Sequence, residues 1–380
     1  MKICIFYGGY LPGEKYGGPV TSIYNFTELF GDDNNIFIVC SNHDLNDNKP
    51  YIGIKSGWNI VGKAKVLYLS ESEFSKQKYI EIIDSIKPDI LYVSSIFSAR
   101  INYPLFSISK ERKVPLLLAP RGELNNTALK RKKIKKSLYL MLLRISGKLK
   151  NVIFQATSEE ERHNIIHNLG VNKEKVFLLP NIPSLPRPKL CLNKEKGSLK
   201  VCFVGRIVAN KNLLFAIEAV QRSKCNVIFD IFGAKEDATY WKQCVAAIKQ
   251  SPQNIQINYR GVLSPLKMNE LYCNYDCLIS PTLFENYGQA IVESMLHDTP
   301  VIISEGTTPW NNIIDFNAGY VITLDKQSEF TKTIDNIGFM EKSEYYNLVN
   351  NLRVYCKETF KYDELIHEYN KAFSKIIGLI

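Results

Sequence analysis

The sequence has no long apolar run, since no stretch reaches the ~20 residues that a helix needs to span a bilayer. Its first residues pass directly into the apolar run Ile3–Phe6, without the basic segment, long apolar core and small-residue cleavage site of a secretory leader. The nine cysteines are scattered without a paired framework, and several of them, such as Cys4, Cys40 and Cys202, lie within apolar runs. We therefore expect reduced core cysteines and a cytoplasmic protein.

Metal-ligand patterns are also sparse. Cys273 and Cys277 lie four residues apart, as do His163 and His167, but neither pair has the further spaced partners that a zinc site requires. We interpret both pairs as structural.

A dinucleotide fingerprint is missing. Gly8-Gly9 and Gly17-Gly18 do not make Gly-x-Gly-x-x-Gly, and the second predicted strand ends in Cys40-Ser41 where an acid is expected. These departures argue against an NAD-linked dehydrogenase.

The chain of 380 residues alternates short apolar runs with longer amphipathic or polar stretches, which indicates parallel β-α units. Its length allows two domains, each with a core of its own. A first series of predicted strands precedes a proline-rich segment at 179–188, and a second series follows it. The first series comprises 2–7, 36–40, 66–69, 89–93, 114–119 and 151–156, and the second 199–204, 226–232, 255–259, 276–280 and 300–303.

Proline density of this kind stops helix and strand alike, so we place the hinge between domains there. Just before it, Thr157 to Glu161 is typical of a capping box that opens a helix. We predict an α/β protein with one domain over 1–185 and a second over 186–360. A final helix is expected over 362–377.

Two glutamates, Glu285 and Glu293, bracket seven residues just after the predicted strand 276–280. Asn286 can cap a helix whose first turn exposes unpaired backbone N–H groups, and such a helix start attracts phosphate. If Glu293 lies about six residues into that helix, it is roughly 9 Å along the axis from the loop. The two carboxylates could then hold the hydroxyls of a sugar and a ribose around a diphosphate. A helix with two solvated glutamates is the alternative.

A second polar segment follows the predicted strand 199–204. Gly205-Arg206 stands at the strand end, and Lys211-Asn212 begins an amphipathic stretch that runs to Val220. Ligands of open α/β sheets bind at this edge, and an arginine with a lysine suits a leaving diphosphate. The alternative is two surface cations.

These segments together resemble the donor site of family 4 retaining glycosyltransferases, and the chain is similar to bacterial surface-polysaccharide enzymes of that family. The resemblance rests on Gly205-Arg206, Lys211 and the glutamates around Asn286-Tyr287-Gly288, and it extends to Tyr16-Gly17-Gly18-Pro19 and Thr299-Pro300-Val301-Ile302. It implies the GT-B architecture, in which two Rossmann-like domains face each other across a cleft. The first would bind the acceptor, the second the nucleotide sugar, and residues 361–380 would cross back to the first.

The resemblance also implies a role for each site residue. Glu285 would meet hydroxyls of the transferred sugar, and Glu293 the ribose. Arg206 and Lys211 would stabilise the departing diphosphate, helped by backbone amides of Gly17, Gly18, Asn286, Tyr287 and Gly288. No Asp-x-Asp of the sort that carries a divalent cation lies between apolar strands, so we expect no metal or other cofactor. The donor is expected to be a uridine diphosphate sugar, with guanosine diphosphate mannose as runner-up.

One position departs from the family pattern. In Ala119-Pro120-Arg121-Gly122-Glu123, Arg121 stands where many relatives carry a histidine before the glycine. Arg121 could pair with a donor phosphate or an anionic acceptor, and Glu123 could meet an acceptor hydroxyl. Either could equally form a surface ion pair.

The formal net charge is +10, and its densest source is a run of six cations in seven residues, followed by a leucine-rich stretch. The cations are Lys130, Arg131, Lys132, Lys133, Lys135 and Lys136. Such a helix can lie in the headgroup layer of an anionic membrane, at ~1 kcal/mol per cation. Alternatively, the leucines face the core and the lysines face water. Without a recognition motif or interleaved aromatics, a nucleic-acid partner is not expected.

The sequence thus predicts a hexosyltransferase that acts peripherally at the inner face of the cell membrane. It would move a sugar, with retention of configuration, from a nucleotide diphosphate sugar to a hydroxyl of a lipid-linked or polysaccharide-precursor glycan, in capsule, O-antigen or exopolysaccharide synthesis. Two alternatives stay open: a nucleotide-sugar epimerase or hydrolase of the same fold, and a catalytically silent membrane-docking module.

Overall fold

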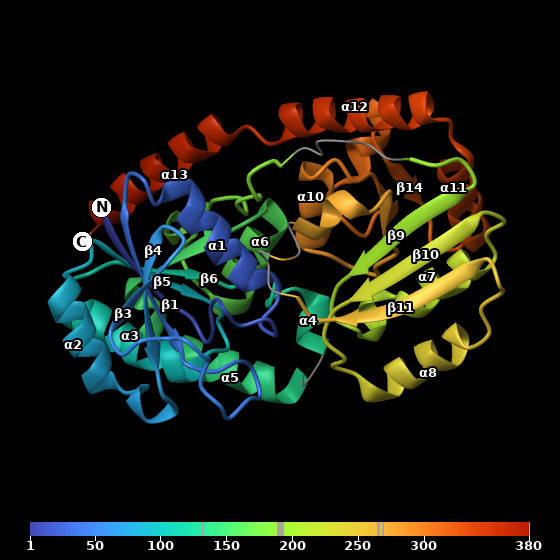
Figure 1. The fold of residues 1–380 in the computed structure, drawn as a ribbon. Helices are drawn as coiled ribbons and strands as arrows, with labels where there is room; N and C mark the ends of the chain where they lie inside the picture. The colour runs from blue at the N-terminus through green and yellow to red at the C-terminus, as the bar shows by residue number, and fades with distance from the viewer. Residues whose placement is uncertain (131–132, 188–193, 264–266, 268–269, 380) are drawn as a thin grey trace. The chain divides into compact units, whose positions relative to one another are not determined.

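The computed structural model describes residues 1–130, 133–187, 194–263, 267 and 270–379. The chain divides into two compact units (Figure 1). The N-terminal unit joins Met1–Ile182 to Tyr362–Ile380, and the C-terminal unit is Pro183–Lys361. The division falls within the proline-rich segment 179–188.

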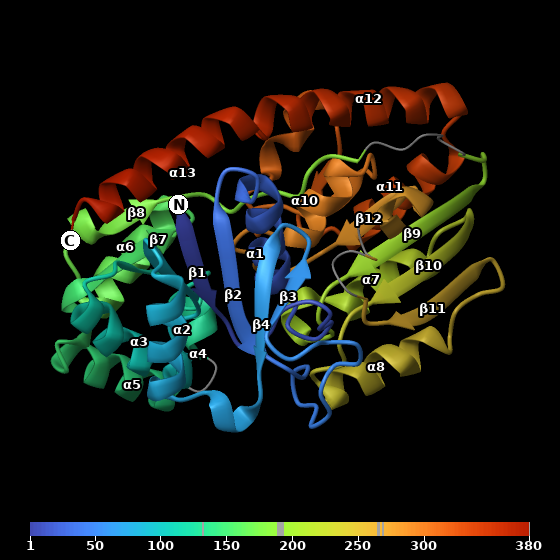
Figure 2. The same ribbon diagram turned by 60° about the vertical axis from the view of Figure 1, so that its left-hand side comes forward.

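An eight-stranded sheet forms the centre of the N-terminal unit, with strand order β3-β4-β2-β1-β5-β6-β7-β8. Neighbouring strands are parallel except β3 and β4, which pair antiparallel (Figure 2). The strands are β1 (Lys2–Phe6), β2 (Asn35–Ser41), β3 (Trp58–Val61), β4 (Ala64–Leu69), β5 (Ile90–Ser94), β6 (Leu116–Ala119), β7 (Val152–Ala156) and β8 (Val176–Leu178).

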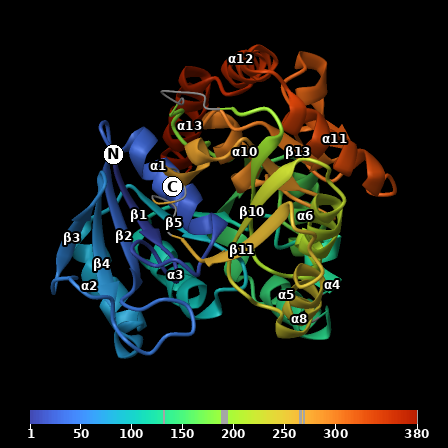
Figure 3. The same cartoon turned by 45° about the vertical axis from the view of Figure 1, so that its right-hand side comes forward.

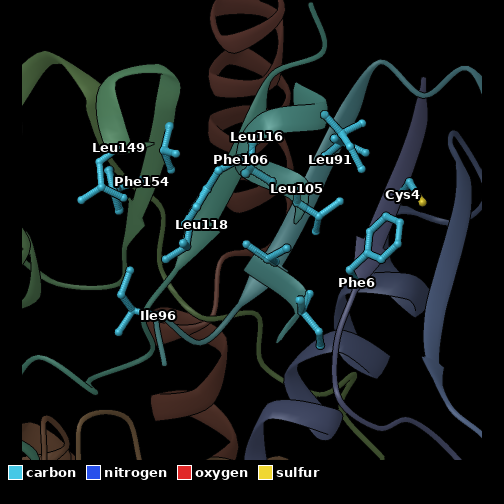
Figure 4. Close-up of a cluster of buried hydrophobic side chains, with 14 of the residues drawn as sticks. Cys4, Phe6, Leu91, Ile96, Leu105, Phe106, Leu116, Leu118, Leu149 and Phe154 are labelled. Atoms are coloured by element: carbon cyan, nitrogen blue, oxygen red, sulfur yellow. The ribbon is translucent and has the colours of Figure 1, made fainter. Parts of the chain in front are cut away.

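Helices cover both faces of this sheet, which explains why its central strands are apolar on both sides. On one face, α1 (Gly18–Phe30) and α13 (Tyr362–Ile377) pack on residues such as Ile3 and Ile5. The opposite face packs Cys4, Phe6 and Leu118 against further helices (Figure 4). Those helices are α2 (Lys76–Ile86), α3 (Ala99–Arg112), α5 (Lys133–Ile145) and α6 (Glu159–Leu169); α4 (Asn126–Lys130) precedes α5.

Tyr369 attaches helix α13 to the rest of the N-terminal unit. The Tyr369 hydroxyl donates to the Pro180 carbonyl at 2.7 Å and accepts from the Gln155 amide at 2.9 Å. Its ring lies 5.3 Å from that of Phe30. The end of the chain is thereby bonded to the segment just before the division between units.

The C-terminal unit holds a six-stranded sheet of order β11-β10-β9-β12-β13-β14, in which every pair is parallel. Strands β10 and β11 run side by side in Figure 3. The strands are β9 (Ser198–Val204), β10 (Asn226–Phe232), β11 (Ile255–Gly261), β12 (Cys277–Ser280), β13 (Val301–Ser304) and β14 (Tyr320–Ile322). The helices are α7 (Leu213–Gln221), α8 (Ala238–Ile248), α10 (Gln289–Leu296), α11 (Gln327–Phe339) and α12 (Lys342–Thr359).

The helix expected after Asn286 starts later than predicted. Gly288 is its N-cap, in the left-handed conformation, and α10 begins at Gln289. The cap prediction for Asn286 was wrong because the backbone at Gly288 turns through a positive φ of 76°, which ends the loop there. Glu293 is therefore the fifth residue of the helix.

Within the described residues, every helix is too short or too polar to cross a bilayer.

Candidate active site

Lys211 and Glu285 form an ion pair in the C-terminal unit, with only 19% and 16% of their side chains exposed. Lys211 ends the short 3-10 turn η4 (Ala209–Lys211) after β9, and Glu285 lies in the loop after β12. Strands β9 and β12 are parallel neighbours, so their carboxyl ends meet at one edge of the sheet. The pair therefore lies where open α/β sheets bind ligands.

Asn210 fixes the loop that carries Glu285. Its backbone carbonyl accepts from Leu283 N at 2.9 Å, and its side-chain amide donates to the Phe284 carbonyl at 3.1 Å. Glu285 N in turn donates to the Thr307 carbonyl at 2.8 Å. Asn210 was not predicted from the sequence, where its one signal is its position beside Lys211.

Arg206 is the second residue after β9 and follows Gly205. About half of its side chain is exposed. Its guanidinium pairs with Glu236, with 3.1 Å between Nη1 and Oε2. The stem of Lys211 lies over Gly205, where an added Cβ would come within 3.7 Å of the Lys211 Cδ. Arg206 and Lys211 thus occupy one strand end, although each has its own acidic partner.

Gly233, at the end of β10, approaches the neighbouring strand end more closely than any side chain would allow. A Cβ there would lie 1.8 Å from the Gly205 carbonyl oxygen, and the residue has φ 144°. Gly233 N also donates to the Gly261 carbonyl at 2.8 Å. The contact packs the ends of β9, β10 and β11 together beside Arg206.

The loop between Glu285 and α10 is braced by Trp310. The indole N–H of Trp310 donates to the Tyr287 carbonyl, and the two rings are 5.3 Å apart in an edge-on arrangement. Gly288 then starts α10 without a side-chain cap. The first turn of α10 leaves backbone N–H groups pointing out of the helix start, where an anion would be favoured.

Glu293 is only 4% exposed, and its carboxylate accepts a 3.0 Å hydrogen bond from the Tyr272 hydroxyl. Burial raises the pKa of Glu293 to about 7, against which the Tyr272 hydrogen bond acts. Tyr272 was not predicted from the sequence, because it lies 21 residues before Glu293 and meets it only in the fold.

In the N-terminal unit, Gly17 and Gly18 begin α1. Gly17 has φ 66°, and apart from the adjoining backbone no atom of the described residues lies within 4 Å of where either Cβ would be. The preceding turn is held by Asp44, whose carboxylate accepts from Glu14 N at 2.8 Å and from Lys15 N at 3.2 Å. The space beside the two glycines is therefore uncrowded, and the turn that leads to them is held by Asp44.

Arg121 turns into the interior of the N-terminal unit. Its guanidinium donates to the Tyr92 hydroxyl at 2.6 Å and to the Asn181 side-chain oxygen, while its buried Nε has no hydrogen-bond partner among the described residues. Its backbone is left-handed, with φ 56°. Glu123 accepts from Ser95 Oγ and from Ile96 N, each at 2.8 Å, and burial raises its pKa.

Residues 191–354 match the family model described as Glycosyl transferases group 1. The comparisons support a glycosyltransferase. Among curated proteins, the chain is 22% identical over 304 residues to an "Uncharacterized 41.2 kDa protein in cps region" of Klebsiella pneumoniae. That match covers 76% of this chain and 79% of the relative.

Solved glycosyltransferase structures of the GT-B fold resemble the whole chain. Anabaena Alr3699/HepE, in complex with UDP and glucose, has a TM-score of 0.69 at 13% identity and covers 99% of this chain and 100% of its own. The sucrose-phosphate synthase (tll1590) of Thermosynechococcus elongatus has a TM-score of 0.72 at 11% identity and covers 100% of both chains. The predicted α/β fold with two GT-B domains is confirmed.

The basic run of the chain lies on and before α5. Lys130, Lys133 and Lys135 are exposed, whereas Arg131 and Lys132 lie outside the described residues. Lys136 is turned inward, donating to the Ala128 carbonyl at 2.7 Å. The roles expected for these cations, and for the site residues above, stay predictions.

Proposed function

We propose that this glycosyltransferase is a retaining enzyme of the family 4 type. It transfers a hexosyl group from a nucleotide diphosphate sugar to a hydroxyl of a lipid-linked or polysaccharide-precursor glycan. The observation that carries the proposal is the shielded Lys211–Glu285 pair at the carboxyl edge of β9 and β12. The pair places a cation, which can stabilise a leaving diphosphate, beside a carboxylate, which can accept hydrogen bonds from sugar hydroxyls.

In the proposed reaction, the bond between the anomeric carbon and the diphosphate oxygen breaks while the acceptor oxygen bonds the same carbon from the same face. The acceptor proton passes to the departing phosphate. Lys211 and Arg206 stabilise the negative charge that develops on the diphosphate. Glu285, released from Lys211, holds the sugar. Electrons and protons balance without a redox partner.

Further donor contacts come from the loop before α10 and from the helix itself. The amides of Asn286, Tyr287 and Gly288 would bind phosphate oxygens, with Glu293 on the ribose. Gly17 and Gly18 would contribute backbone amides, while Arg121, bonded within its own unit, would act on the reaction through the loop that it supports. Positive side chains take the place of a metal ion, so activity is expected to survive a chelator. A loss in EDTA that manganese or magnesium restores would contradict this.

We favour a uridine diphosphate sugar as donor, with guanosine diphosphate mannose as runner-up. The similar Anabaena protein was solved with UDP and glucose, which supports the first. The relative from a cps region supports a role in surface-polysaccharide synthesis. The acceptor would be met at the inner face of the cell membrane, to which the basic run on α5 would recruit the enzyme.

A thermal-shift series with UDP, GDP and their sugars tests the donor, because a ligand that binds only the folded state raises apparent stability. UDP should raise the melting temperature of the wild type and have a much smaller effect on Lys211→Met. Product analysis then separates the alternatives. Transfer to an added acceptor supports the proposal, whereas free sugar or an epimer formed from donor alone supports a hydrolase or epimerase.

A further inference from the structure

The outer face of α5 carries an apolar ridge. Ile134, Leu138, Met141 and Ile145 are between 50% and 87% exposed. Because a helix turns about 100° per residue, these four side chains fall within about 60° of one another around the axis. We call them the α5 ridge. Leu142, 52% exposed, borders it.

The opposite face of α5 attaches the helix to the domain. Leu140 and Leu143 are buried there, and the Tyr139 hydroxyl donates to the Ile96 carbonyl at 3.0 Å. Lys136 lies on this side too, 4.8 Å from the centre of the Phe97 ring. The α5 ridge therefore points away from the core, on a helix whose other face is firmly packed against the domain.

Cations border the ridge without any acidic neighbour in sequence. Lys133 and Lys135 are exposed on its two sides at one end of α5, and Arg144 is exposed at the other. Residues 124–158 contain nine lysines or arginines and no aspartate or glutamate. An exposed apolar stripe with cations along both sides is the pattern of a helix that lies in a membrane interface.

We infer that the α5 ridge inserts into the acyl boundary of an anionic bilayer, while Lys133, Lys135 and Arg144 bind the headgroups. This inference deepens the membrane association proposed above, because it assigns insertion to the apolar residues and removes Lys136 from the contact surface. The charge pattern favours lipid over a second copy of this chain or nucleic acid as the partner of the ridge. In a two-fold dimer the same patch faces itself, so cations would oppose cations. Nucleic acid offers nothing complementary to four aliphatic side chains.

The test is flotation of the full chain with vesicles of phosphatidylglycerol and phosphatidylcholine, compared with phosphatidylcholine alone. The ridge variant is Ile134→Gln, Leu138→Gln, Met141→Gln, which keeps every cation. The charge variant is Lys133→Gln, Lys135→Gln. Val354→Gln on α12 is the control, since Val354 is an exposed apolar residue of comparable exposure, 55%, on another helix. Because all substituted residues lie at the surface, each variant should fold, and its melting temperature with UDP checks this.

The ridge variant should bind anionic vesicles roughly tenfold to hundredfold more weakly than the wild type, from the apolar area it loses. Val354→Gln should bind as the wild type does. Wild-type binding should also persist in part at ~0.5 M salt, which screens the headgroup attraction but not the insertion. The charge variant should lose affinity mainly at low salt.

Three outcomes would overturn the inference. If the ridge variant binds as the wild type while the charge variant does not, association is electrostatic alone, and the proposed recruitment stands without insertion. If the wild type ignores anionic vesicles, both the insertion and the recruitment fail, although sugar transfer in solution would be unaffected. If the ridge variant only converts a dimer to a monomer, or only releases nucleic acid, the ridge serves that partner.

Discussion

The hydroxyl of Tyr272 donates a hydrogen bond to the carboxylate of Glu293 inside the C-terminal unit, with 3.0 Å between the oxygens. Tyr272 belongs to the 3-10 turn η5 (Tyr272–Asn274) and Glu293 to α10. His297 lies one turn further along, its Nδ1 2.6 Å from the Glu293 carbonyl oxygen. Burial of the carboxylate raises the pKa of Glu293 to about 7, and the hydrogen bond from the neutral Tyr272 hydroxyl offsets only part of that rise.

Glu293→Gln should flatten the pH dependence of stability. The pKa of Glu293 rises from 4.5 to about 7, so the folded state binds this proton more tightly than the unfolded state does. Its stabilising contribution is therefore complete below the unfolded pKa and is lost as pH rises through the folded pKa. Between about pH 5 and about pH 8 the free energy of unfolding of the wild type should fall by up to about 3 kcal/mol, whereas that of Glu293→Gln should not show this fall. Urea unfolding at both pH values measures this.

Tyr272→Phe serves as the companion variant. Without the hydroxyl, the carboxylate loses the hydrogen bond that lowers its pKa, so the fall in stability should move to higher pH. If the free energies of unfolding of the wild type and Glu293→Gln change with pH in the same way between about pH 5 and about pH 8, Glu293 does not titrate in that range.

Central strands such as β5, β6 and β13 were predictable from sequence because each is a short, largely apolar run buried on both faces. Strands β3, β8 and β14 were missed for the opposite reason. β3 (Trp58–Val61) lies at a sheet edge with alternate residues exposed, while β8 and β14 have three residues each and also lie at edges. Such short segments become strands only because a neighbouring strand supplies their hydrogen bonds.

The candidate site was predictable where strand ends determine position. Lys211 and Glu285 follow neighbouring strands, and the structure places them in contact; their chemical roles stay predictions. The contacts of Asn210, Tyr272 and Trp310 were not predictable, because each reaches a residue at least 21 positions away that only the fold brings near.

Lys211→Met should lower kcat by about a hundredfold to a thousandfold, as removal of one preorganised charge-stabilising group does in other enzymes. The methionine keeps the stem that covers Gly205 and removes only the charge. Initial rates with a nucleotide sugar and an acceptor measure the effect. Lys200→Met on the exposed side of β9 is the control and should retain wild-type kcat. Equal kcat for the wild type and Lys211→Met would remove Lys211 from the reaction.

Gly233→Ala should be strongly destabilising, by about 3 kcal/mol or more, because its Cβ would lie 1.8 Å from the Gly205 carbonyl oxygen and the backbone cannot yield cheaply. Gly261→Ala is the control that separates the steric clash of the added Cβ from the strain of placing alanine at a positive φ. Gly261 also has a positive φ, of 87°, but within the described part of the chain no atom other than those of its chain neighbours lies within 4 Å of its Cβ position. It should cost only about 1 kcal/mol. Similar melting temperatures for the two variants would show that the strand ends can separate.

Asp44→Ala should release the turn that precedes Gly17. The Asp44 carboxylate is 8% exposed and accepts from Glu14 N, Lys15 N and Leu45 N. Its removal leaves these N–H groups unsatisfied at a cost of about 1–3 kcal/mol. Amide hydrogen exchange should accelerate over residues 14–18, and if Gly17 and Gly18 contact donor phosphate, the KM for the nucleotide sugar should rise.

Asp47→Ala is the matched control for Asp44→Ala, because the Asp47 side chain meets the same turn through an exposed ion pair with Lys15. Such a pair contributes at most about 1 kcal/mol, so exchange over 14–18 should stay close to that of the wild type. A rise in exchange without a change in KM would confine Asp44 to holding the turn, and would separate Gly17 and Gly18 from donor binding. Unchanged exchange in Asp44→Ala would instead mean that the turn keeps its shape without the carboxylate.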